Sequence, residues 1–163
     1  MPQLTLTLNG QAQSLEVEAN TLLLDLLRER FRLTGSHRGC DTAQCGACTV
    51  RVNGQASKAC NLLALQCEGA TVQTVEGLRP DGADWHPMQL AFSQHHGLQC
   101  GFCTPGMLMR ACAMADEGCP PERAAVRQGL AGNLCRCTGY EGIVDAVCAG
   151  LRSLQEGEPR AAL

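Results

Sequence analysis

Hydrophobic and polar residues alternate along the first half of the chain, which is the pattern of β-strands with one buried face. The predicted strands are LTLTLN (4–9), SLEVE (14–18), the hairpin TVRVNGQASKAC (49–60) and ATVQTVEG (70–77). Asn-Gly pairs at 9–10 and 53–54 are typical of tight hairpin turns. The segment TLLLDLLRER (21–30) differs, because its leucines follow helical spacing. This pattern predicts a mixed α and β domain over residues 1–77.

The second half of the chain loses this alternation, and glycines or prolines divide it into four segments of helical character. The predicted helices are HPMQLAFSQHHG (86–97), PGMLMRACAMADEG (105–118), PPERAAVRQGLAG (120–132) and YEGIVDAVCAGLRSLQE (140–156). Between the halves, LRPDGAD (78–84) combines proline, glycine and charge, which is the composition of a linker. We therefore predict an α+β fold with a linker at 78–83 and a helical domain at 84–155.

Composition limits the functions that the chain can have. The net charge of −3 and the scarcity of aromatic residues, with one Trp, one Tyr and three Phe, argue against nucleic-acid binding. The chain lacks a run of about 18 apolar residues, so no transmembrane helix is predicted. Its first residues, MPQLTLTLNGQ, lack the basic and apolar regions of a signal peptide. We expect a cytoplasmic chain, and in a reducing compartment a pattern of 12 cysteines indicates metal sites rather than disulfides.

One group of cysteines has the spacing Cys40-x4-Cys45-x2-Cys48 and continues with Cys60. Plant-type ferredoxins hold a [2Fe–2S] cluster with this spacing, in which a short loop lets three thiolates converge. Gly46 leaves the backbone room to approach such a cluster closely. A tetrahedral zinc site with four thiolates is the alternative. The x4-then-x2 loop, placed after predicted strands and a helix, favours the cluster.

Another group consists of Cys100-x2-Cys103 and Cys135-x-Cys137, two pairs separated by enough chain for two helices to fold back. Each pair precedes a predicted helix. Helix N-termini offer free N–H groups and favour the thiolate form of cysteine. Four thiolates at one centre indicate either an iron–sulfur cluster or zinc, and the residues alone leave both open.

Three motifs, CDTAQCGACTV, QCGFCTPGM and GNLCRCTGY, occur in this order and together resemble the iron–sulfur subunit of the molybdenum hydroxylases, the xanthine oxidase family. The resemblance covers residues 3–152 and is nearest to the separate small subunits of bacterial enzymes, with carbon monoxide dehydrogenases foremost. It implies an N-terminal β-grasp [2Fe–2S] ferredoxin-like domain followed by a C-terminal four-helix [2Fe–2S] binding domain. It assigns one cluster to Cys40, Cys45, Cys48 and Cys60, and the other to Cys100, Cys103, Cys135 and Cys137.

The resemblance also implies a function in electron transfer. Electrons would pass from a molybdenum–pterin centre on a large subunit, through both clusters, to FAD on a medium subunit. The complex would be a heterotrimer or a dimer of heterotrimers. Gln99 and Cys137 would lie near the pterin, and the chain itself would carry no catalytic residue. The substrate stays open among carbon monoxide, aldehydes, purines and N-heteroaromatic compounds.

The residues alone leave two other functions open. One is a free-standing two-cluster ferredoxin, and the other is a zinc-stapled interaction module without redox activity. An apolar patch exposed on the helical domain would favour a permanent partner over the free ferredoxin. Four further cysteines fit neither group, and we expect them to pack as small hydrophobic residues: Cys67, Cys112, Cys119 and Cys148.

Overall fold

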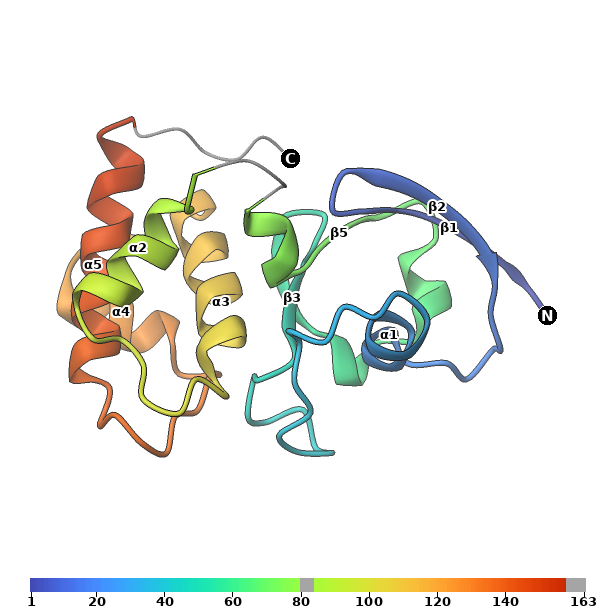
Figure 1. The fold of residues 1–163 in the computed structure, drawn as a ribbon, viewed down its shortest axis with the longest axis horizontal. Helices are drawn as coiled ribbons and strands as arrows, with labels where there is room; N and C mark the ends of the chain where they lie inside the picture. The colour runs from blue at the N-terminus through green and yellow to red at the C-terminus, as the bar shows by residue number, and fades with distance from the viewer. Residues whose placement is uncertain (80–83, 158–163) are drawn as a thin grey trace.

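The computed structural model of the chain describes residues 1–79 and 84–157, which form a half built on a sheet and a helical half beside it (Figure 1). Within these residues the sheet has five strands in the order β2-β1-β5-β3-β4. The strands are β1 (Gln3–Leu8), β2 (Gln11–Glu16), β3 (Thr49–Val52), β4 (Gln55–Lys58) and β5 (Thr71–Gln73). β1 pairs antiparallel with β2 and parallel with β5, while β3 pairs antiparallel with both β4 and β5. This mixed sheet confirms the fold predicted for the first half.

The first hairpin, β1–β2, forms because its apolar residues alternate with polar ones and an Asn-Gly turn joins its strands. Leu4, Leu6 and Leu8 of β1 alternate with threonines, and all three leucines are buried in one hydrophobic core. Asn9 and Gly10 make the turn with φ angles of 48° and 80°, a left-handed conformation that Asn and Gly adopt more readily than other residues. The second predicted hairpin, β3–β4, uses the same kind of Asn-Gly turn. Both predicted hairpins are therefore confirmed.

The closing strand is shorter than the predicted segment 70–77. β5 gives way to a 3₁₀ turn, η4 (Val75–Leu78), because the backbone N–H of Thr74 bonds to Oδ1 of Asn9 at 2.9 Å instead of to a neighbouring strand. Leu78 is 1% exposed and packs in the core of the helical half. Residues 80–83 of the predicted linker lie outside the described residues. The predicted limits of the linker and of the two domains thus stay a prediction.

A helical segment covers the core of the first half. α1 (Leu23–Asp25) continues directly into a π-helical turn, η1 (Leu26–Arg30), and two 3₁₀ turns, η2 (Ala59–Asn61) and η3 (Ala64–Cys67), follow β4. The leucines of this segment that are buried in the same core as β1 are Leu23, Leu24, Leu26 and Leu27. The predicted helix is confirmed in place, although it begins two residues later than the predicted segment 21–30.

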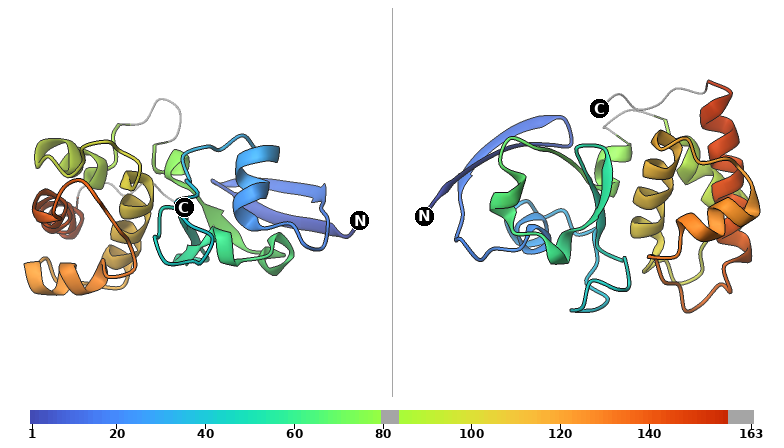
Figure 2. Two further views of the ribbon diagram at one scale, coloured as in Figure 1. Left: turned by 90° about the horizontal axis from the view of Figure 1, so that it is seen from below. Right: turned by 180° about the vertical axis from the view of Figure 1, so that it is seen from behind.

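The helical half has its own hydrophobic core. Its helices within the described residues are α2 (Pro87–Gln94), α3 (Thr104–Asp116), α4 (Arg123–Gly129) and α5 (Glu141–Gln155). α2 and α4 both pack against α5 (Figure 2). Phe92 of α2, Met107 and Met109 of α3 and Ile143 of α5 are fully buried between them. The four predicted helices are confirmed.

No helix among the described residues is both long enough and apolar enough to cross a membrane.

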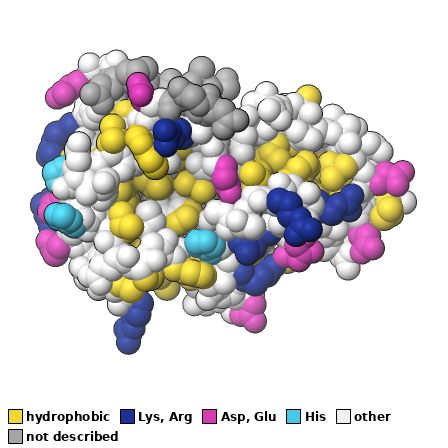
Figure 3. Space-filling model, in the orientation of Figure 1, with side chains coloured by type: hydrophobic (Ala, Val, Ile, Leu, Met, Phe, Trp, Pro, Cys, Tyr) yellow, Lys and Arg dark blue, Asp and Glu magenta, His cyan; other side chains and the backbone are white. Residues whose placement is uncertain are grey.

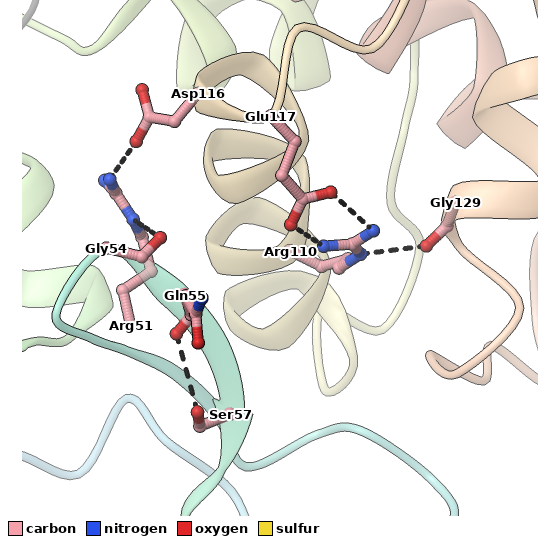
Figure 4. A network of polar contacts seen from close by, with 8 residues as sticks. All are labelled: Arg51, Gly54, Gln55, Ser57, Arg110, Asp116, Glu117 and Gly129. Carbon is pink, nitrogen blue, oxygen red and sulfur yellow. Dashed lines mark hydrogen bonds and ion pairs between the residues drawn. The ribbon is translucent and has the colours of Figure 1, made fainter.

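The two halves meet where α3 lies against β3 and β4 (Figure 1). Arg51 on β3 is only 6% exposed, and it forms an ion pair with Asp116 at the end of α3 (Figure 4). Arg51 also donates a hydrogen bond to Oε1 of Gln73 at 2.8 Å. On the same helix Arg110 pairs with Glu117 at 2.7 Å, but that carboxylate side chain is 51% exposed. Because burial removes the hydration of a guanidinium, Arg51 depends on its partner more than Arg110 does.

His86 lies near this ion pair and is also buried. Its Nδ1 accepts a hydrogen bond from the backbone N–H of Met88 at 3.1 Å and so caps the first turn of α2. Burial lowers the pKa of His86, and the positive charge of Arg51 lowers it further. His86 therefore acts as a neutral hydrogen-bond acceptor in the folded chain.

We expect Asp116→Asn to weaken the junction more than Glu117→Gln does. Asp116→Asn keeps the size of the side chain but leaves the buried charge of Arg51 without an anion. Because the Asp116 side chain is itself 36% exposed, the expected loss in free energy of unfolding is about 1–3 kcal/mol. Glu117→Gln should lose about 0–1 kcal/mol, as exposed pairs do. Urea unfolding of the cluster-loaded chain measures both, and equal losses would contradict the assigned roles.

The stability of the chain should fall in mild acid through His86. Its pKa in the folded chain lies below the ordinary value of 6.5, so the unfolded chain binds more protons as the pH falls through that value. The stabilisation from neutral His86 is present above pH 6.5 and is lost below it. His86→Asn, which still caps a helix, should flatten the acid side of the stability profile. Gln94→Asn changes an exposed residue without a titrating group at the other end of α2 and should leave the profile as it is.

Candidate metal centres

The first cysteine group (Cys40, Cys45, Cys48 and Cys60) lies in the loop between η1 and β3 and in the turn after β4. The β3–β4 hairpin returns the chain so that the N–H of Ala59 bonds to the carbonyl of Cys48 at 3.3 Å, which brings Cys60 beside Cys48. In the loop, the N–H of Cys45 donates to Sγ of Cys40 at 3.4 Å. The thiols stand as two interacting pairs, Cys40 with Cys45 and Cys48 with Cys60.

Backbone donors and burial act in opposite directions on the first cysteine group. The backbone N–H groups of Cys45 and Thr42 lower the pKa of Cys40 to about 6, so this thiol is mostly ionised at neutral pH. Burial raises the pKa of Cys48 to about 11. A bound metal offsets that cost, because coordination removes the thiol proton. The loop thus supplies one ready thiolate and one thiol that needs a metal to ionise.

The second cysteine group (Cys100, Cys103, Cys135 and Cys137) lies in the loops that precede α3 and α5. The Sγ atoms of Cys100 and Cys137 are 3.5 Å apart, and both residues are exposed. Cys103 and Cys135 form a less exposed inner pair. Cys103 directly precedes the first residue of α3, as predicted. The structure therefore brings together the four cysteines that the sequence motifs grouped.

Thr138 and Tyr140, which lie between Cys137 and α5, were not predicted to take part in the site. The hydroxyl of Tyr140 accepts a hydrogen bond from the N–H of Cys135 at 2.9 Å, and Oγ1 of Thr138 lies 3.1 Å from Sγ of Cys135. Burial raises the pKa of Cys135, but the Thr138 hydroxyl and nearby backbone N–H groups outweigh it, so the pKa is lowered. Burial raises the pKa of Cys103 to about 12. The signal for Thr138 and Tyr140 was their place in the motif GNLCRCTGY.

Paired thiols fit a [2Fe–2S] cluster, in which each of two irons takes two protein ligands. The hydroxyl of Thr104, next to Cys103, is buried and has no hydrogen-bond partner within residues 1–79 and 84–157. A sulfur atom of a cluster bound by Cys103 would give this hydroxyl an acceptor. The residues present therefore fit the cluster.

The two cysteine groups adjoin each other across the junction of the halves. The N–H of Leu134 donates to the carbonyl oxygen of Cys45 at 2.8 Å, so the residue next to Cys135 is bonded to a member of the first group. The ring of His37 stacks on that of Phe102 with centroids 4.5 Å apart. Nδ1 of His37 also lies 2.8 Å from the Phe102 carbonyl oxygen. The two loops form one continuous contact.

The remaining residues named from the sequence divide between the surface and the cores. Gln99 is exposed beside Cys100, at the rim of the second group. Cys112 is 3% exposed, and burial raises its pKa to about 12. The four cysteines outside the groups all pack in or against the two hydrophobic cores: Cys67, Cys112, Cys119 and Cys148. Their surroundings are those of small apolar residues.

Comparison with known families assigns a cluster-binding domain to each half. The domain family described as "2Fe-2S iron-sulfur cluster binding domain" matches residues 6–77. The family described as "[2Fe-2S] binding domain" matches residues 74–148. These matches support iron–sulfur clusters rather than zinc at both cysteine groups.

Relatives that match this chain over most of their own length extend this assignment. The gamma subunit of caffeine dehydrogenase from Pseudomonas sp. (strain CBB1) is 46% identical over 150 residues, which cover 88% of this chain and 87% of that protein. The small subunit of nicotine 6-hydroxylase from Paenarthrobacter nicotinovorans is 45% identical and covers 89% of this chain and 87% of that protein.

Solved structures agree in fold. A chain of quinoline 2-oxidoreductase from Pseudomonas putida 86 superposes with a TM-score of 0.90 at 42% identity, over 97% of this chain and 98% of that chain. Aldehyde oxidoreductase from Desulfovibrio gigas superposes with a TM-score of 0.91 at 40% identity, but this chain covers only 18% of that longer chain. The chain described here belongs to the iron–sulfur subunits of the molybdenum hydroxylases of the xanthine oxidase family.

Proposed function

We propose that this chain relays electrons from a molybdenum–pterin centre on a large subunit to FAD on a medium subunit of one enzyme complex. The observation that carries the proposal is the contact between the two cysteine groups, through the hydrogen bond from Leu134 to Cys45. We assign the ligands of one cluster to Cys40, Cys45, Cys48 and Cys60, and those of the other to Cys100, Cys103, Cys135 and Cys137. When bound, each cluster can take up and release one electron.

The chain's own residues hold the ligands and shape the surface toward the partners. Backbone N–H groups around Cys40 and the hydroxyl of Thr138 beside Cys135 favour the thiolate forms that bind iron. Hydrogen bonds of this kind also tune the reduction potential of a bound cluster. No residue of the chain is assigned to substrate chemistry, which we place on the large subunit.

An apolar surface around the second cysteine group supports a permanent partner. Leu98, Phe102 and Leu134 are 40%, 48% and 52% exposed, and they flank the exposed Cys100 and Cys137. In Figure 3, hydrophobic side chains come to the surface over α2, α3 and the loop that precedes α3. Monomeric soluble proteins rarely expose large apolar patches. The patch favours a subunit of a complex over a free-standing ferredoxin.

We assign this apolar surface to the side that faces the molybdenum–pterin subunit. Gln99 and Cys137 both lie in it and are exposed, so they are the proposed contacts to the pterin. The first cysteine group would then face the flavin subunit. A heterotrimer, or a dimer of heterotrimers, in the cytoplasm is part of the same proposal, since a reducing compartment keeps ligand thiols available.

The substrate belongs to the partner subunit and is not fixed by this chain. The relatives described above carry the names of a caffeine dehydrogenase, a nicotine hydroxylase, a quinoline oxidoreductase and an aldehyde oxidoreductase. Three of these names refer to N-heterocyclic compounds and one to aldehydes. We therefore propose an N-heterocyclic compound or an aldehyde as the substrate class of the complex.

Removing one ligand from each group should remove one cluster at a time. The loaded chain should contain about four irons, and Cys48→Ala or Cys103→Ala should each leave about two. In the reduced protein, each variant should lose a different one of two electron paramagnetic resonance (EPR) signals. Cys67→Ala and Cys112→Ala change buried cysteines outside the groups and should keep both signals. Iron loss in these two variants equal to that in the ligand variants would contradict the ligand assignment.

A charge on the apolar surface should release the molybdenum partner without releasing iron. Leu134→Glu puts a carboxylate on the exposed rim of the second group and should weaken association with the large subunit at least about tenfold, as at interface hot spots. Leu63→Glu changes a residue of similar type that is 38% exposed on the other half. Molybdenum and flavin are measured after native purification through this chain. If both variants retain molybdenum equally, the assigned surface is wrong. If the unaltered chain contains iron but no molybdenum, the result supports a free ferredoxin.

A further inference from the structure

Asn133 belongs to the loop of the second cysteine group but hydrogen-bonds to the loop of the first. It lies two residues before Cys135 and is 5% exposed. Its side-chain Nδ2 donates to the carbonyl oxygen of Gly46 at 3.0 Å and to the hydroxyl oxygen of Thr49 at 3.1 Å. Gly46 follows Cys45, and Thr49 follows Cys48. Both hydrogens of one amide are thus used on residues next to two proposed ligands of the first cluster.

The Gly46 carbonyl that receives this bond is enclosed from several sides. It also accepts hydrogen bonds from the hydroxyl of Thr49 at 2.6 Å and from the Thr49 N–H at 3.1 Å. A Cβ on Gly46 would lie 2.7 Å from Nδ2 of Asn133, closer than side chains tolerate. A Cβ on Gly106, in the first turn of α3, would collide with the same carbonyl oxygen. The contact therefore admits no side chain on either glycine and has little freedom to shift.

The neighbouring backbone bond depends on the same contact. Leu134 follows Asn133 directly, and its N–H donates to the Cys45 carbonyl at 2.8 Å. Two adjacent residues of one loop therefore bond to two adjacent residues of the other, Cys45 and Gly46. Without the Asn133 amide, the remaining contacts between the two loops that are described above are this backbone bond and the contacts of His37 with Phe102, which are the ring stacking and the approach of Nδ1 of His37 to the Phe102 carbonyl oxygen at 2.8 Å.

Other contacts hold the halves of the chain together away from this point. The ion pair of Arg51 with Asp116 joins β3 to the far end of α3. The loss of Asn133 should therefore leave the halves docked while it loosens the two loops. A buried amide whose donors are all used fixes orientation more than it adds stability, since its net contribution is modest.

We propose that Asn133 is a positioning residue that sets the distance and orientation between the two cluster sites. The proposal rests on the proposed function, in which both sites hold clusters. Its consequence is a single, fixed spacing between the two redox centres. Replacement of Asn133 should broaden that spacing and slow electron transfer between the clusters, while each cluster keeps its own ligands.

The test is the magnetic interaction between the two reduced clusters in the full-length loaded chain. This interaction splits their EPR signals by an amount that depends on the distance and relative orientation of the clusters. Asn133→Asp removes the donors, and Asn133→Leu removes them without adding charge. Both should keep about four irons per chain and both signals, but lose the resolved splitting. A change confined to overall stability would leave the splitting unaltered.

The matched control is Asn9→Asp. Nδ2 of Asn9 donates to the Thr74 hydroxyl at 3.0 Å within the first half, far from the cysteine loops in the sequence. Asp tolerates the left-handed backbone at that turn. Asn9→Asp makes the same change of charge as Asn133→Asp and should keep the splitting of the unaltered chain.

Thr49→Val covers the case in which the Asn133 variants lose iron. It removes one acceptor of the amide and leaves the bond to Gly46, so a smaller change in splitting is expected. Two results would overturn the positioning role. One is that every iron-loaded Asn133 and Thr49 variant shows the same splitting as the unaltered chain. The other is that the unaltered chain itself shows two signals without any splitting. An unaltered chain that binds no iron, or shows only one signal, would instead overturn the proposed function.

Discussion

The hydrogen bond from the N–H of Leu134 to the carbonyl of Cys45 joins two cysteine loops, and neither half of the chain can form it alone. Loops usually run over the surface, where water satisfies their polar groups. Here two loops turn toward each other, so their backbone groups must bond across the junction. Such an approach requires positions without side chains, and Gly46 and Gly106 provide them. Gly106 lies in the first turn of α3, so the close approach at Gly46 also places α3 against the sheet.

The distribution of buried polar residues reflects this arrangement. Each half closes its own hydrophobic core, and the cores are almost purely apolar. Buried polar side chains such as Thr49, Arg51, Gln73, His86 and Asn133 gather instead near the junction. A buried polar group is costly unless its partner is in place. These side chains therefore favour one docked arrangement over the many that an apolar interface would allow.

The features that local residue spacing encodes could be predicted from the sequence. Contacts between residues far apart in the sequence could not. The alternation of leucines and the Asn-Gly turns predicted the hairpins, and the cysteine spacings predicted which thiols meet. The end of β5 was missed because it depends on the side chain of Asn9, which lies 65 residues from Thr74. The bond of Asn133 to Gly46 spans 87 residues. No periodicity or motif spacing reports such pairs, because they arise only when segments far apart in the sequence pack together.

Both hydrophobic cores of the chain are buried, but apolar residues stay exposed around the second cysteine group. This chain matches 98% of a chain of quinoline 2-oxidoreductase and only 18% of the longer aldehyde oxidoreductase chain, with the same fold in both. A fold that occurs both as a separate chain and as part of a longer chain must bury its hydrophobic residues without help from the rest of the protein. The two hydrophobic cores of this chain do so. Burial is incomplete at Leu98, Phe102 and Leu134. Exposed apolar residues beside the exposed thiols of Cys100 and Cys137 are costly for an isolated protein, and a partner that covers them removes that cost. The exposed apolar surface thus coincides with the second cysteine group, where we propose that electrons enter the chain.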